Sequence, residues 1–155
     1  AATPLGELVV LAFFGIAGVA GTALLHGAPV RADVLLLGVG VGLPAAAVLL
    51  VNNHRDRVSD ARAGRRTLAI LLGPRATRAL YGGLITAAAA APLALRPACP
   101  AAWLATAGLA VAAIVLARRF ARAPLDPVLN RFLEATGRFQ LALVAATALV
   151  LALCG

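Results

Sequence analysis

The sequence predicts an all-α membrane protein, a bundle of about five transmembrane helices. Three observations indicate this fold class. Of the 155 residues, 62% are hydrophobic and only 13% are charged, and the mean hydropathy is +0.95. These values lie far outside the composition of soluble domains. The apolar residues gather in five runs that predict helices crossing a bilayer, and the arginines gather between the runs.

The five apolar runs cover about residues 5–25, 34–51, 79–95, 101–116 and 139–153. A hydrocarbon core of about 30 Å needs about 20 helical residues. The last three runs are shorter, so we expect their helices to extend into the flanking residues. Small residues let helices pack closely in lipid, and the candidates are Gly15, Gly18, Gly21, Gly38, Gly42 and the run 87–91. We interpret residues 1–155 as a single transmembrane domain.

The arginines predict the orientation of the bundle. Seven lie between the second and third runs and five between the fourth and fifth, whereas the other two gaps hold only Arg31 and Arg96. Twelve of the 14 basic residues therefore share one side, which the positive-inside rule makes cytoplasmic. The net charge of +8 is confined to these gaps and forms no broad solvated face, so the chain is not expected to bind nucleic acid.

The remaining local signals concern the chain start and the cysteines. The sequence begins with Ala and contains no Met, so we expect a fragment of a longer protein or a trimmed chain. The first apolar run lacks the basic flank of a signal peptide. Cys99 and Cys154 stand far apart without His neighbours, so they are not expected to bind metal, and we interpret them as two inert small hydrophobic residues.

Residues 52–73 form a charged segment, interpreted as a cytoplasmic Asp-rich loop or cap. Its acidic and amide residues need an explanation, because Asp and Glu contribute little to membrane topology. If the second helix continues past its apolar end, Asn52, Asp56 and Asp60 fall at i, i+4 and i+8 on one face. Gly64 follows four residues later and is the candidate for the residue that ends this helix.

Two carboxylates and an amide oxygen on one face suit Mg²⁺, which takes oxygen ligands and commonly combines one or two carboxylates with substrate phosphate oxygens. Arg65 and Arg66, with Arg55 and Arg62 nearby, would then contact the remaining phosphate oxygens. The substrate class that fits is a diphosphate head with an apolar tail. A solvated loop in which the two aspartates offset neighbouring arginines fits the same spacing, and spacing alone does not decide between the two.

Two short sequences, NNHRD at 52–56 and DARAGRRTLA at 60–69, resemble the second Asp-rich motif of the UbiA superfamily of intramembrane prenyltransferases. The doubled Asn resembles the branch that prenylates 1,4-dihydroxy-2-naphthoate in menaquinone synthesis, commonly called MenA. LGELVVLAFFG from Leu5, LLGPRATRALY from Leu71 and LDPVLNRFLEATGR from Leu125 resemble that branch's fifth span, the start of its seventh span and the loop before its last span. The resemblance covers essentially the whole chain.

The resemblance implies a nine-helix fold in the bacterial inner membrane, of which this chain would be the C-terminal half, with the Asp-rich loop cytoplasmic. It implies Mg²⁺-dependent transfer of a polyprenyl group from polyprenyl diphosphate to 1,4-dihydroxy-2-naphthoate. Asp56 and Asp60 would bind the metal and serve catalysis. The residues expected to bind the diphosphate are Arg65, Arg66, Arg55, Asn52 and Asn53. Arg55 is expected either to contact substrate or to brace Asp60 through an ion pair.

Further candidate positions lie outside this stretch or at its variable position. Glu7, Asp126 and Arg138 lie in segments that resemble the family, while His26 and His54 are expected at the surface. The chain contains nothing like the family's first Asp-rich motif, so we expect it to be inactive alone and to need the missing N-terminal half.

Three other functions stay open. One is another UbiA-type aromatic prenyltransferase, and another is a non-catalytic membrane scaffold or regulatory relative. A small-molecule transporter fits less well, because the interiors of the apolar runs hold few polar residues.

Overall fold

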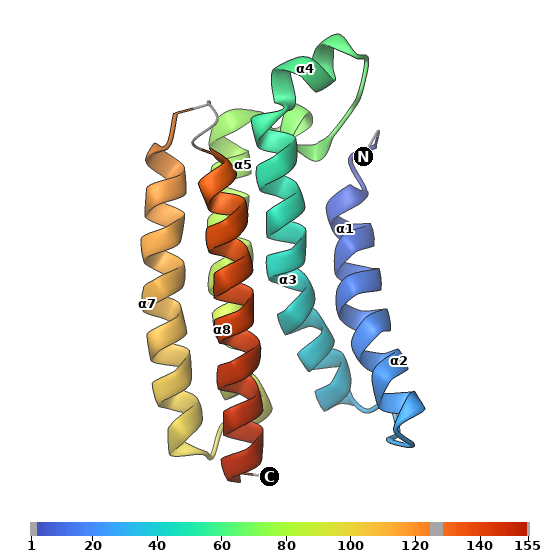
Figure 1. The fold of residues 1–155 in the computed structure, drawn as a ribbon, viewed down its shortest axis with the longest axis vertical. Helices are drawn as coiled ribbons and strands as arrows, with labels where there is room; N and C mark the ends of the chain where they lie inside the picture. The colour runs from blue at the N-terminus through green and yellow to red at the C-terminus, as the bar shows by residue number, and fades with distance from the viewer. Residues whose placement is uncertain (1–2, 125–128, 155) are drawn as a thin grey trace.

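The computed structural model of the chain describes residues 3–124 and 129–154. All regular structure in these residues is helical: α1 (Gly6–Val10), η1 (Leu11–Ala17), α2 (Gly18–Leu25), α3 (Ala32–Arg55), α4 (Arg57–Arg62), α5 (Leu68–Ala89), α6 (Ala91–Leu95), α7 (Pro100–Arg122) and α8 (Asn130–Cys154). α1, the π-helical segment η1 and α2 follow one another without a break. Figure 1 shows this combined helix, α3, α7 and α8 running along the long axis, with α5 behind α8 and with α4 at one end. We call that end the α4 end.

The all-α membrane bundle predicted from the sequence is confirmed. Among the described residues, four helical stretches are long and apolar enough to cross a membrane: Gly6–Leu25, Ala32–Arg55, Pro100–Arg122 and Asn130–Cys154. The last two are longer than the apolar runs that predicted them, as expected. The third run, 79–95, is divided between α5 and α6. α5 is not apolar enough to count among these four, because Arg75, Arg78 and several small residues lower its mean hydropathy. It is also kinked at Gly73, whose φ is 71°.

Glycines bring the first long helix and α3 into contact, as their small size predicts. A Cβ on Gly15 would overlap the carbonyl oxygen of Gly38 and would lie 2.7 Å from the Cα of Gly42. A Cβ on Gly38 would lie 2.9 Å from the Cα of Ile16. A Cβ on Gly21, by contrast, would meet no atom within 4 Å. Close packing therefore depends on particular glycines on one face and not on glycine content.

An aromatic cluster fixes α3, α5, α7 and α8 to one another near the α4 end. Tyr81 and Phe120 are fully buried with ring centroids 4.3 Å apart, and the Tyr81 hydroxyl shares a hydrogen bond of 2.8 Å with Thr136 Oγ1. Phe132 packs edge-on against Phe120. His54 also packs edge-on against Phe120 and is fully buried, so its expected surface position is wrong. The charged segment after α3 therefore begins next to a tightly packed part of the core.

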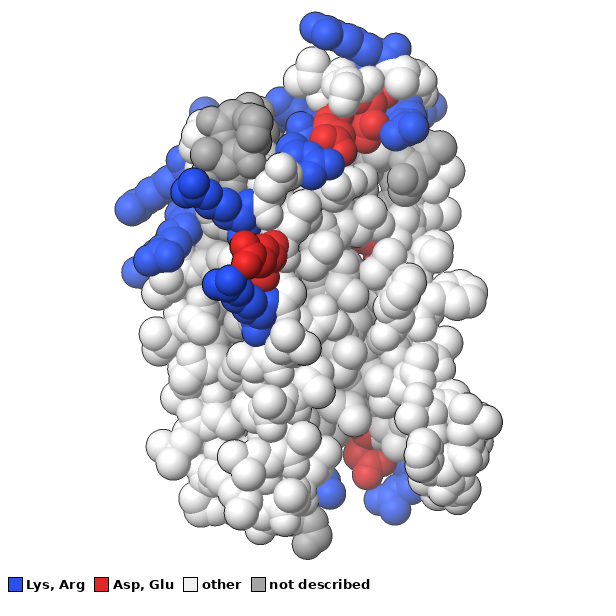
Figure 2. All heavy atoms as spheres, viewed as in Figure 1, with Lys and Arg blue, Asp and Glu red and all other residues white. Residues whose placement is uncertain are grey.

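The opposite end of the bundle carries a disulfide between Cys99 and Cys154, whose Cα atoms are 6.2 Å apart. The interpretation of two unpaired cysteines is wrong. α7 and α8 are antiparallel neighbours, so the residue before α7 meets the end of α8 despite a sequence separation of 55. Figure 2 shows most charged side chains at the α4 end and few at the opposite end, which agrees with the alternation of arginine-rich and arginine-poor gaps.

Candidate functional site

The charged segment follows α3 directly but does not continue it as one helix. α3 ends at Arg55 and α4 begins at Arg57, with Asp56 between them at φ −88° and ψ 5°. The expected uninterrupted helix is therefore broken at Asp56. Helical hydrogen bonds still cross the break: the Asp56 N–H donates to the Asn52 carbonyl at 3.0 Å, and the Asp60 N–H donates to the Asp56 carbonyl at 2.8 Å. The three motif residues therefore stay one turn apart.

α4 ends in a Schellman motif. Gly64 has φ +72°, its N–H donates to the Ala61 carbonyl at 3.1 Å, and the Arg65 N–H donates to the Asp60 carbonyl at 2.9 Å. The helix end expected at Gly64 is confirmed. The motif reverses the chain so that the Arg65 guanidinium meets the Asp60 carboxylate, with NH1 2.9 Å from Oδ1. Asp60 is buried, although α4 lies at the surface of the bundle.

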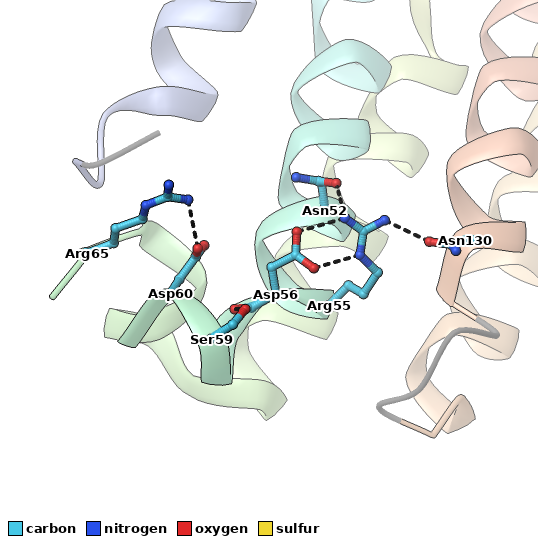
Figure 3. A network of polar contacts seen from close by, with 7 residues as sticks. All are labelled: Asn52, Arg55, Asp56, Ser59, Asp60, Arg65 and Asn130. Atoms are coloured by element: carbon cyan, nitrogen blue, oxygen red, sulfur yellow. Dashed lines mark hydrogen bonds and ion pairs between the residues drawn. The ribbon is translucent and has the colours of Figure 1, made fainter. Parts of the chain in front are cut away.

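Arg55 forms the second ion pair, with Asp56. Its Nε and NH2 donate to Oδ1 and Oδ2 of Asp56, both at 2.7 Å, in a bidentate arrangement (Figure 3). NH2 also donates to Asn52 Oδ1, and NH1 donates to Asn130 Oδ1 at the start of α8, each at 2.7 Å. The hydrogen bonds from Arg55 hold the pKa of Asp56 below its usual value. Arg55 therefore forms its ion pair with Asp56, and the alternative in which it pairs with Asp60 is not found.

The two carboxylates are thus each paired with an arginine, the arrangement that the spacing left open. Figure 3 shows both carboxylates on the same side of the α4 ribbon, with Arg55 and Arg65 on opposite flanks. Among residues 3–124 and 129–154, no three His, Cys, Asp or Glu side chains come together as a metal site. The donor set itself fits Mg²⁺, because Asp56, Asp60 and Asn52 offer hard oxygens, and Mg²⁺ commonly completes its shell with substrate phosphates and water.

Asn53 points away from these ion pairs and into the bundle. Its Nδ2 donates to Glu7 Oε1 at 2.8 Å, and both residues are buried. Glu7 Oε2 is buried without a hydrogen-bond partner in the part of the chain that the structure describes. The candidate Glu7 therefore contacts the motif directly, since the start of α1 packs against the end of α3.

The other predicted residues lie outside this network. Arg66 is exposed and has no carboxylate within 4 Å in the described residues. Arg138 is exposed and pairs with Glu134 one turn away on α8. His26 is exposed beyond α2, as expected. Asp126 lies outside the described residues.

Asn130 is the site residue that sequence reasoning missed. It approaches Arg55 across 75 positions of sequence. Its only sequence signal was its place in the segment that resembles the loop before the family's last span.

Two apolar cavities lie along α3, the nearer one reaching the ion-paired cluster at Asn52, and we call the two together the apolar groove. A cavity of about 420 Å³ is lined by Asn52, Val48 and Phe14, together with residues of α8. Phe14 also lines a second cavity of about 650 Å³, which continues along α3 to Val34 and is closed on one side by α8 residues such as Leu151. The α3 residues that line the two cavities extend from Asn52 to Val34, about 27 Å at 1.5 Å per residue. Its walls are almost entirely hydrocarbon.

Comparison with known proteins places this geometry in context. The chain is 41% identical over 99 residues to the 1,4-dihydroxy-2-naphthoate octaprenyltransferase of Haemophilus influenzae, covering 64% of this chain and 32% of that protein. It is 33% identical over 151 residues to the protein of the same name from Mycobacterium leprae, covering 97% of this chain and 51% of that protein. It is also 40% identical over 81 residues to UbiA prenyltransferase domain-containing protein 1 of Xenopus tropicalis, covering 52% of this chain and 24% of that protein.

The chain spans at most about half the length of these relatives. No solved structure matches it significantly. The model of the UbiA prenyltransferase family matches residues 1–143, which is most of the chain and includes the whole ion-paired cluster and most of the groove. The chain therefore belongs to the UbiA prenyltransferase family.

Proposed function

We propose that this chain supplies the second Asp-rich motif of a 1,4-dihydroxy-2-naphthoate polyprenyltransferase, together with part of the apolar groove that holds the isoprenoid tail of its substrate. The observation that carries the proposal is the position of the acid, amide and arginine cluster beside two neighbouring apolar cavities along α3. The nearer cavity is lined by Asn52, whose Oδ1 already belongs to the Arg55 network. A diphosphate with an isoprenoid tail matches this arrangement, with the head at the cluster and the tail along α3.

The arginines and the acids divide the work at the diphosphate. Arg55 and Arg65 hold the Asp56 and Asp60 carboxylates in place through the ion pairs described above. Arg65 donates one hydrogen bond to Asp60 and keeps N–H groups that can bind phosphate oxygens bidentately, whereas Arg55 already donates four of its five N–H groups and mainly positions Asp56. Arg66 is exposed at the same end and would add a third positive charge. Together these charges favour departure of the diphosphate, because negative charge builds up on it as the allylic C–O bond breaks.

Asp56, Asp60 and Asn52 would hold Mg²⁺, which would supply further stabilisation of the leaving diphosphate when bound. The naphthoate ring would then form the new bond to the allylic carbon with loss of the ring carboxylate as CO₂. Apolar groove walls exclude water, which would otherwise capture the allylic cation.

Orientation in the membrane is part of the proposal. We place the α4 end in the cytoplasm of a bacterial cell and the opposite end outside the inner membrane. Twelve arginines lie in the gaps at the α4 end, and the Cys99 disulfide lies at the other, where an oxidising compartment would preserve it. A membrane-impermeant maleimide should label Ala63→Cys only after cells are permeabilised, and labelling of intact cells would contradict this orientation.

The activity test combines this chain with an N-terminal half that carries the first Asp-rich motif. The chain purified alone with Mg²⁺, isoprenoid diphosphate and 1,4-dihydroxy-2-naphthoate should give no product above background. Co-expression with the N-terminal half of the Mycobacterium leprae relative should give prenylated product. Asp56→Ala and Asp60→Ala should each abolish that product, whereas Glu134→Ala, an exposed acid at the same end, should retain it. Product from the chain alone, or activity that survives both aspartate substitutions, would contradict the proposal.

Two related functions remain as outcomes of the same test. Prenylation of a different aromatic acceptor would support another UbiA-type enzyme. A non-catalytic scaffold or regulatory role would leave cellular function intact after Asp56→Ala and Asp60→Ala.

A further inference from the structure

A second basic site lies on the outside of the bundle, between α5 and α7. A cavity of about 570 Å³ is lined by Arg75 and Arg78 at the start of the long part of α5 and by Arg118 near the end of α7. The remaining lining residues are alanines and Gly82. None of these residues belongs to the ion-paired cluster or to the apolar groove along α3.

The positive charge of this cavity is not neutralised by the described part of the protein. In residues 3–124 and 129–154, no carboxylate lies within 4 Å of Arg75, Arg78 or Arg118. Arg78 is held in place by backbone carbonyls, with NH1 donating to Ala121 at 3.1 Å and NH2 to Ala123 at 2.5 Å. Its Nε is buried without a partner in the same residues. Three guanidinium groups around one cavity favour an anion between them.

Along α5 the cavity lining changes from charged to apolar, while on α7 Arg118 directly follows the apolar Ala117. Gly82 lies one helical turn beyond Arg78, about 6 Å deeper into the bundle. A Cβ on Gly82 would lie 3.3 Å from the Cβ of Ala117, so α5 and α7 are in close contact there and close the bottom of the cavity. Ala79 and Ala121 line the cavity and are exposed on its outer side. A ligand in this cavity would therefore meet both guanidinium groups and the apolar surface of alanine and glycine residues.

We propose that the cavity lined by Arg75, Arg78, Arg118, Gly82 and Ala117 binds the phosphate headgroup of an anionic phospholipid, such as phosphatidylglycerol. The basic residues lie at the end of helices that border the hydrocarbon of the bilayer, where lipid phosphates are concentrated. Basic pockets between transmembrane helices are a recognised geometry for anionic headgroups. A free phosphate ion would contact the arginines but would leave the alanine and glycine surface of the cavity uncovered. The inference does not depend on the prenyltransferase activity proposed above.

Native mass spectrometry of the purified chain in detergent tests this site. The chain is offered an equal mixture of phosphatidylglycerol and phosphatidylcholine with identical acyl chains, and the wild type should retain phosphatidylglycerol preferentially. Arg75→Gln combined with Arg118→Gln should weaken phosphatidylglycerol binding about thirtyfold, from about a fivefold loss per surface charge. Arg78 is left unchanged because it also holds the end of α7. The matched control is Arg119→Gln with Arg131→Gln, which removes two exposed charges from the same end outside the cavity.

A second variant separates shape from charge. Ala79→Trp fills the exposed side of the cavity without altering net charge, and it should also abolish the preference for phosphatidylglycerol. Equal loss in the cavity variant and the charge-matched control would overturn the proposal, since net charge alone would then explain binding. Equal retention of both lipids by the wild type would overturn it as well. Displacement of the lipid by millimolar inorganic phosphate would show a small-anion site and would also contradict a lipid site.

Discussion

Gly15 is the position where one added methyl group should push the first long helix away from α3. The alanine Cβ would overlap the Gly38 carbonyl oxygen and lie 2.7 Å from the Gly42 Cα, and both are backbone atoms that no side-chain rotation removes. Overpacking of this kind costs about 1–3 kcal/mol. Alanine also gains about 1 kcal/mol over glycine in a helix interior. The measured change in unfolding free energy will contain both effects.

Gly21 provides the matched control for separating them. It lies in the same continuous helix, and an alanine Cβ there meets no atom within 4 Å. Gly21→Ala therefore has the helix-propensity gain without the clash. We expect Gly15→Ala to be about 1–3 kcal/mol less stable than Gly21→Ala. Reversible unfolding in detergent, followed by circular dichroism, measures this difference, and equal stability of the two variants would refute the close contact between η1 and α3.

Three further predictions concern single contacts. Glu7→Ala leaves the buried Asn53 amide unpaired and should destabilise the fold by about 1–3 kcal/mol, whereas Glu7→Gln keeps an acceptor oxygen and should cost less in the same unfolding assay. Because Arg55 lowers the pKa of Asp56 below 3.8, their pairing stabilises the fold above that pH and is lost as pH falls through the lower folded-state pKa. Acid unfolding curves should show this loss, and Asp56→Asn should remove it. Reducing the Cys99 disulfide, which closes a loop across 55 residues, should lower stability by up to about 4 kcal/mol in thermal melts with and without reductant.

Much of the fold could be predicted because lipid imposes strong constraints on composition. The apolar runs predicted the long helices, and the arginine-rich gaps predicted which ends of the helices share one side of the membrane. The position of Gly64 after the motif predicted the end of α4, since glycine adopts positive φ without strain. The break at Asp56 was harder to predict. Ser59 Oγ donates to the Asp56 carbonyl at 2.8 Å in addition to the helical bond from the Asp60 N–H, and neither hydropathy nor helical periodicity indicates the break.

The partners of the charged residues depend on three-dimensional packing. Asp56 and Asp60 are both near Arg55 in sequence. The turn at the end of α4 brings Arg65 to Asp60, so these two form one ion pair and Arg55 forms the other with Asp56. The contact of Arg55 with Asn130 depends on how α8 packs beside α3, which no local pattern encodes. The burial of His54 and the pairing of the two cysteines have the same origin in helix packing.

Binding of a divalent cation tests the proposed diphosphate site most directly. The chain in lipid nanodiscs would be titrated with Mn²⁺, as a visible substitute for Mg²⁺, and followed by electron paramagnetic resonance with and without an isoprenoid diphosphate. We expect Mn²⁺ binding that requires the diphosphate, is lost in Asp56→Asn with Asp60→Asn, and is retained in Asp33→Asn with Glu134→Asn. Binding that persists in the first double variant, or that ignores the diphosphate, would contradict a metal-diphosphate role for the two aspartates.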